Sequence, residues 1–142
     1  MKHVAVCTLL IAVLALGTAC SKTEDRTNEA IQAAEAIVKN TIVKIDAITA
    51  KVKNAKTAAE AASLVGEFLT TALSIKDEVG GLEQRFPAKS LDKNKIEAAL
   101  KSVMDETKAA GQRFGAALMA LPTDIRESNE VAEALKKLQG AM

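Results

Sequence analysis

The stretch that decides the fold is residues 31–55, IQAAEAIVKNTIVKIDAITAKVKNA. Residues suited to burial recur along this stretch at alternating spacings of three and four positions. They are Ile31, Ala34, Val38, Thr41, Ile45, Ile48, Val52 and Ala55. Because an α-helix has 3.6 residues per turn, this spacing places them on one face of a helix. Asn54 suits a helix C-terminal cap, and Thr57-Ala58-Ala59-Glu60 has the pattern of a capping box that begins the next helix. Helices joined by so short a turn lie antiparallel.

Two further segments of similar length repeat this spacing. The second carries Ala58, Ala61, Val65, Phe68, Ala72, Ile75, Val79, Leu82 and Phe86 on one face, and the third carries Ile96, Leu100, Val103, Thr107, Ala110, Phe114, Ala117 and Leu121. Leu82 and Phe86 stay in phase across Gly80-Gly81, so we expect the second helix to continue to about Phe86, before Pro87. A break at Gly80 is the alternative.

The third predicted helix is capped by Ser90 or Asp92 and ended by Pro122. A shorter segment opens at Thr123 or Ser128 and closes at Gly140. No alternating apolar and polar run predicts a strand. The sequence therefore predicts an all-α fold, an up-down antiparallel bundle of three long helices plus a short C-terminal fourth helix, as a single domain over residues 30–142.

The N-terminus carries a different signal. Residues 4–16 are apolar, the small residues Gly17-Thr18-Ala19 follow, and Cys20 ends the pattern. Such a segment is typical of a secretory signal peptide and is well short of the ~20 residues that span a bilayer. The pattern resembles the lipobox of bacterial lipoproteins, although Gly17 stands where most lipoboxes carry Leu.

The resemblance implies that residues 1–19 are removed and that Cys20 receives a diacylglycerol, which anchors the protein to a membrane. Residues 20–29 then form a short polar tether or an early start of the first helix. By resemblance to enteric lipoproteins, Ser21 favours the outer membrane, with the inner membrane, the leaflet and the side left open. The alternative is an ordinary signal peptide cut after Ala19, which gives a secreted or periplasmic protein with one exposed thiol. Cys7 has no room for an apolar core before it.

Composition excludes most kinds of catalytic site. After residues 1–19 are removed, the chain has no histidine and Cys20 is its only cysteine. Nucleophilic triads and His-based zinc, haem or copper sites cannot be assembled, so we expect no catalytic residues, no metal, no cofactor and no enzyme activity. Loss of Lys2 leaves 18 basic against 18 acidic residues, and the three Phe are accompanied by no Trp or Tyr. A neutral chain without stacking platforms argues against nucleic acid as a partner.

Three local patterns have a structural and a functional interpretation. Gly111 and Gly115 resemble a GxxxG motif, which predicts close helix contact inside the bundle or a self-association surface. Lysines in the second half of the first predicted helix complement its dipole, with contact to lipid phosphate or an anionic glycan as the alternative. Asp77-Glu78 and Asp105-Glu106 are adjacent carboxylates that point about 100° apart, so we expect solvated surface charge rather than a cation site.

Four apolar residues are candidates for a groove beside the fourth helix that accepts an acyl chain or a partner helix, and they are Phe68, Met104, Phe114 and Leu118. Ordinary core or core-edge packing is the alternative. The sequence thus favours a lipid-anchored, non-enzymatic bundle of the bacterial envelope that binds another envelope or surface protein or has a structural role. The sequence indicates neither a particular partner nor an oligomeric state. A carrier of a lipid or another apolar small molecule is the second hypothesis.

Overall fold

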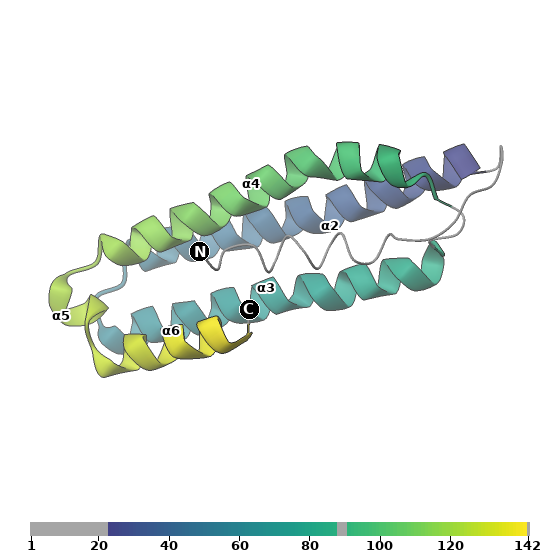
Figure 1. The fold of residues 1–142 in the computed structure, drawn as a ribbon. Helices are drawn as coiled ribbons and strands as arrows, with labels where there is room; N and C mark the ends of the chain where they lie inside the picture. The colour runs from purple at the N-terminus through teal and green to yellow at the C-terminus, as the bar shows by residue number, and fades with distance from the viewer. Residues whose placement is uncertain (1–22, 88–90, 142) are drawn as a thin grey trace. The chain divides into compact units, whose positions relative to one another are not determined.

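The computed structural model describes residues 23–87 and 91–141, and within these ranges every regular element is a helix. The three long helices are α2 (Thr23–Val52), α3 (Ala58–Arg85) and α4 (Lys93–Met119), and the shorter α5 (Thr123–Arg126) and α6 (Asn129–Ala141) follow (Figure 1). The predicted all-α bundle with a short C-terminal helix is confirmed. None of the helices in the described ranges is both long and apolar enough to cross a membrane. The predicted signal peptide, Cys20 and Ser90 lie outside the described residues.

The N-terminal boundary of the helical part lies earlier than residue 30. α2 begins at Thr23, so Thr23–Glu29 form its first turns. Of the two interpretations of the polar segment 20–29, the early helix start therefore holds from Thr23 onward. Thr27 is buried in this part of α2, and Arg26 and Glu29 are exposed.

Side-chain caps define the turn between α2 and α3. The Asn54 side-chain amide donates a hydrogen bond to the Ala50 carbonyl at 2.9 Å, and this satisfies a carbonyl that the ending helix leaves unpaired. The Glu60 N–H donates to Thr57 Oγ1 at 3.2 Å, as the capping box predicts. The Glu60 carboxylate accepts from the Lys56 N–H at 2.8 Å, one residue earlier than the standard arrangement.

The connection from α3 to α4 also follows its local chemistry. α3 is continuous through Gly80-Gly81, and the Phe86 N–H still donates to the Leu82 carbonyl at 2.8 Å. The predicted continuation to Phe86 is confirmed. Asp92 caps α4, because its Oδ1 accepts from the N–H groups of Asn94 at 3.0 Å and Lys95 at 3.2 Å.

The C-terminal segment contains two helices where the sequence predicted one. A single turn, α5, begins at Thr123, and α6 begins after Ser128, whose Oγ accepts from the Val131 N–H at 3.3 Å. Both predicted starting points are therefore used. Arg126 donates from Nη1 to the Met119 carbonyl at 2.9 Å, so α5 closes the C-terminal end of α4.

The packing divides into two compact units, each built from parts of the three long helices. Unit 1 takes the chain up to Asn40 and Ser74–Glu106. Its buried cluster of Ala34, Ile96 and Leu100 is flanked by the partly buried Ile31, Leu82 and Leu91.

Unit 2 takes Thr41–Leu73 and the chain from Thr107 onward. Its core is larger and contains Ile45, Ile48, Val52, Ala61, Val65, Phe68, Ala110, Phe114, Ala117, Leu118, Leu121, Ile125, Val131 and Leu138. Figure 1 shows α6 lying along the first half of α3, and Val131 and Leu138 bury its apolar face there. Burial of this kind is the main source of helix stability in proteins.

Candidate functional site

The structure brings three of the four predicted groove residues together and buries them. The Phe68 and Phe114 rings are stacked, with centroids 4.0 Å apart and planes 10° from parallel. Their residues are 9% and 2% exposed, and Leu118 is 7% exposed in the same core cluster. Met104 is half-buried and belongs to unit 1. This burial favours core packing over an open groove as the role of Phe68, Phe114 and Leu118.

A surface hollow of about 600 Å³ lies in unit 2, where α2 ends and α3 begins. It is lined by Ala50, Lys51, Asn54, Ala55, Glu60, Ser63 and Leu64. The polar groups around it take part in local structure, because Lys51 pairs with Glu67 at 3.1 Å and Asn54 and Glu60 cap the adjoining helix ends. No sequence pattern predicted this hollow, since it arises where two helix ends meet.

The interpretation of Gly111 and Gly115 as a close helix contact is wrong. A Cβ atom added at either glycine meets no neighbouring atom within 4 Å. The pattern therefore does not serve backbone approach to another helix in the described part of the chain. Both glycines lie inside α4, where the absence of a side chain weakens the helix.

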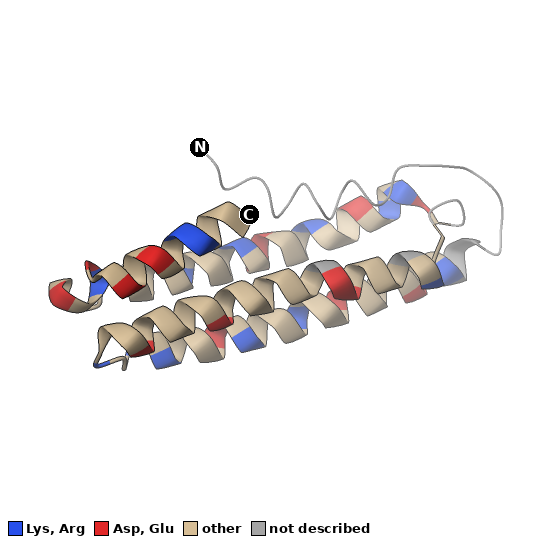
Figure 2. Ribbon diagram, turned by 90° about the horizontal axis from the view of Figure 1, so that it is seen from below, with Lys and Arg blue, Asp and Glu red and all other residues tan. Residues whose placement is uncertain are grey.

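Charged residues of both signs are interspersed along the helices (Figure 2). The best-formed ion pair joins α2 to α4, where Arg113 donates from Nε and Nη2 to Asp46 Oδ1 at 3.0 and 2.8 Å, and from Nη2 to Oδ2 at 2.9 Å. The adjacent carboxylates Asp77-Glu78 and Asp105-Glu106 are exposed. Within the described ranges, no three His, Cys, Asp or Glu side chains gather where a metal ion could bind.

Two contacts between helices were not predicted from the sequence. Thr27 is fully buried, and its Oγ1 accepts from the Asp92 N–H at 3.0 Å, joining the beginning of α2 to the beginning of α4. A signal was present, because Thr27 continues the spacing of Ile31, Ala34 and Val38 by one more helical turn. The Asp46–Arg113 pair had no such signal, because its residues are 67 positions apart.

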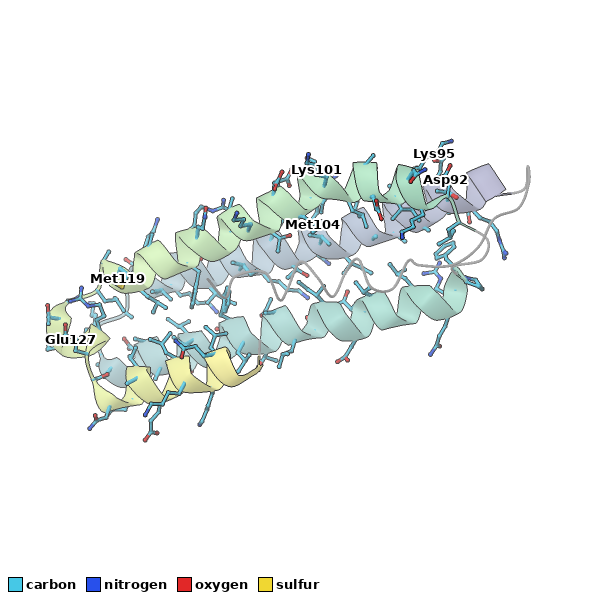
Figure 3. The ribbon with its side chains drawn as sticks, viewed as in Figure 1. Asp92, Lys95, Lys101, Met104, Met119 and Glu127 are labelled. Atoms are coloured by element: carbon cyan, nitrogen blue, oxygen red, sulfur yellow. The ribbon has the colours of Figure 1, made fainter. Side chains whose placement is uncertain are left out.

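The comparisons with known proteins give no match to a protein-family model, to a curated protein or to a solved structure. The functional proposal therefore rests on the residues of this chain. Outside the cores, the large apolar side chains exposed among the described residues are Val43, Leu73 and Met119. Figure 3 shows Met119 near the end of α4 that leads into α5.

Proposed function

We propose that this chain is a bacterial envelope lipoprotein, anchored through a lipid on Cys20, whose helical bundle is a non-enzymatic binding or structural module. The observation that carries the proposal is the N-terminal sequence, in which the apolar run 4–16 and Gly17-Thr18-Ala19 lead directly to Cys20. No other cysteine follows in the chain. In an oxidising compartment, acylation explains a lone cysteine at this position better than a free thiol.

The short distance between the cysteine and the first helix supports a membrane-proximal module. Only Ser21 and Lys22 separate Cys20 from Thr23, where α2 begins. Three residue steps span at most about 11 Å. A lipid on Cys20 therefore keeps the beginning of α2 close to the membrane surface.

The distribution of polar side chains supports a role without catalysis. Catalytic groups are usually held in a cleft where burial and neighbouring charges change their protonation. In the part of the chain that the structure describes, the buried polar residues are Thr27, Thr41 and Thr49. Thr49 donates its hydroxyl proton to the Ile45 carbonyl at 2.8 Å, a bond internal to its helix. Carboxylates that could act as an acid and base pair are exposed, as at Asp77-Glu78.

Acylation is tested by labelling growing cells with a palmitate analogue and comparing the wild type with Cys20→Ser and Cys7→Ser. Cys7 is the matched control, because it is the only other cysteine and lies inside the predicted signal peptide. We expect label on the wild type and Cys7→Ser and none on Cys20→Ser. Globomycin, which inhibits lipoprotein signal peptidase, should leave the wild type as a larger precursor. The proposal is contradicted if the wild type carries no label and its processing is insensitive to globomycin.

The binding role is tested with a photo-crosslinking residue at Leu73, which is 43% exposed, in cells that carry the anchored protein. A crosslinked envelope or surface protein supports a binding module. Val65 provides the matched control, because it lies on the same helix and is fully buried. Equal crosslinking at both positions would show that the captured protein recognises an unfolded chain, which contradicts specific binding through the bundle surface.

A further inference from the structure

The last helix, α6, is held to the rest of unit 2 by a short apolar face. Two of its thirteen residues, Val131 and Leu138, are buried in the core of unit 2. Ala134 and Leu135 are partly buried against the same core, and the other described residues of α6 are exposed. The contact that keeps α6 along the first half of α3 in Figure 1 therefore depends on four side chains.

The long helices of unit 2 are joined by polar contacts that α6 lacks. Lys51 of α2 pairs with Glu67 of α3 at 3.1 Å, and Arg113 of α4 pairs with Asp46 of α2 at 2.8 Å. Within the described ranges, no side-chain hydrogen bond or ion pair joins α6 to these helices. Apolar attraction is non-directional. The position of α6 is therefore less specifically fixed than the positions of α2, α3 and α4 in this unit.

The preceding helix, α5, is fixed independently of α6. Ile125 of α5 is buried in the core of unit 2, and Arg126 donates to the Met119 carbonyl at 2.9 Å. Two residues, Glu127 and Ser128, connect α5 to α6. Hinges in proteins are often a few residues at the ends of elements that absorb a change in backbone dihedral angles. A change at these two residues can release α6 while α5 stays in place.

The length of α6 determines what happens on release. A helix of thirteen residues is at the lower limit of what persists alone in water, even for favourable sequences. Undocking therefore exposes the backbone N–H groups of α6 to solvent along with its apolar face. Segments with few buried apolar contacts are the ones that open below the free energy of global unfolding.

Release of α6 uncovers part of an apolar core. Val131 and Leu138 belong to the same cluster as Phe68 of α3 and Leu118 of α4. Phe68 is 9% exposed and Leu118 is 7% exposed while α6 is docked. Removal of the two α6 side chains from this cluster brings apolar surface of the long helices into contact with solvent.

From these observations we propose that α6 is a lid on the core of unit 2, which opens as one unit at Glu127 and Ser128 while α2, α3 and α4 keep their fold. The closed form is the one described above. The open form presents apolar surface that includes Leu118. The inference adds a conformational switch to the proposed non-enzymatic module and does not depend on the lipid anchor.

The first experiment measures native-state hydrogen exchange of the mature protein, purified from its own membranes in detergent. After correction for intrinsic rates, we expect the amides of residues 133–138 to exchange about 100-fold or more faster than those of residues 64–68 in α3. We also expect similar protection across 133–138, because the lid opens as one unit. Equal protection in α6 and α3 overturns the proposal. Protection that declines steadily towards Ala141 also overturns it, because that gradient shows fraying of a helix end.

The second experiment weakens the apolar face of α6. Val131→Ala removes buried apolar surface, so it should raise exchange across residues 133–138 by about tenfold or more and leave residues 64–68 unchanged. Glu133→Gln is the matched control on the exposed face of α6 and should leave both segments unchanged. The lid is wrong if Val131→Ala raises exchange equally in α6 and α3, because α6 is then an integral part of the core.

The third experiment detects the uncovered surface by thiol alkylation. The V131D/L138D variant opens the lid, because an unpaired carboxylate is strongly disfavoured in an apolar core. In this variant, Leu118→Cys should react with N-ethylmaleimide much faster than in the parent. Ile48→Cys, which lies in the same core on α2, should remain protected. Reaction at both positions means that unit 2 unfolds without α6, and reaction at neither means that opening uncovers no core surface. Either result contradicts the lid.

Peptide mass mapping of the alkylated protein separates this inference from the anchor. Alkylation found on Cys20 means that this residue is not acylated, which contradicts the anchor and leaves the lid unaffected. Alkylation of Leu118→Cys is read from its own peptide and bears on the lid alone.

Discussion

At the scale of single residues, the stacked pair of Phe68 and Phe114 fills the centre of unit 2. Phe114→Ala should lower the free energy of unfolding by about 3–5 kcal/mol, because it removes buried apolar surface and leaves a cavity. Urea denaturation followed by circular dichroism measures the change. Val43→Ala is the control, since Val43 is 66% exposed and should change stability by less than about 0.5 kcal/mol. A similar small loss for Phe114→Ala would mean that the stacked pair is not part of a packed core.

The Asp46–Arg113 ion pair should contribute far less to the free energy of unfolding than its short hydrogen-bond distances suggest. Its side chains are 45% and 49% exposed, so water and salt screen the attraction. A double-mutant cycle with Asp46→Asn and Arg113→Gln should give a coupling of about 0.2–1 kcal/mol that falls at high salt. A coupling well above that range and insensitive to salt would show that the pair is desolvated in the folded protein.

At the scale of helices, the glycines inside α3 and α4 weaken elements that the cores hold together. Gly80, Gly81, Gly111 and Gly115 are helical, and an added Cβ meets nothing within 4 Å at any of them. Alanine at each position should therefore raise the free energy of unfolding by roughly 0.5–1 kcal/mol. Thermal melts of the four single variants measure this, with Ala59→Gly on an exposed position of α3 as the reverse control. A loss of stability at Gly111→Ala would restore a close contact at that glycine.

The beginning of α4 depends on its cap and on the buried threonine beside it. Asp92→Ala should cost about 1 kcal/mol, because it removes the acceptor of two backbone N–H groups. Asp92→Asn keeps an acceptor and should recover most of that loss. Hydrogen exchange of the Asn94 and Lys95 amides reports the same cap locally. Unchanged exchange in Asp92→Ala would mean that other groups satisfy these N–H donors.

Helical periodicity explains which structural features could be read from the sequence. Heptad spacing predicted the long helices, and the apolar residues that stay in phase across Gly80-Gly81 predicted that α3 is continuous. Both predictions were possible because an apolar stripe on one helix face follows from the order of neighbouring residues in the chain. Pairing between distant residues leaves no such trace, as the Asp46–Arg113 contact shows. The prediction of a close helix contact at Gly111 and Gly115 was wrong because small residues occur both at close helix contacts and on open helix surfaces.

At the scale of the whole molecule, the described helices bury apolar stripes in the separate cores of unit 1 and unit 2 and leave charged faces exposed. Such a fold supports many functions, so the fold alone does not select one. The proposed function rests on the sequence at Cys20, where a lipobox-like pattern predicts a covalent modification. The contact between the beginning of α2 and the beginning of α4 required the structure, because Thr27 and Asp92 are 65 positions apart in the chain.

The intact mass of the mature protein, extracted from its native membrane with detergent, tests the lipid anchor most directly. We predict the mass of a chain that begins at Cys20 with covalently bound diacylglycerol, and a tandem spectrum that places the added mass on that residue. A mature chain that begins at Cys20 with no added lipid, or one that retains residues 1–19, would contradict the anchored-module function.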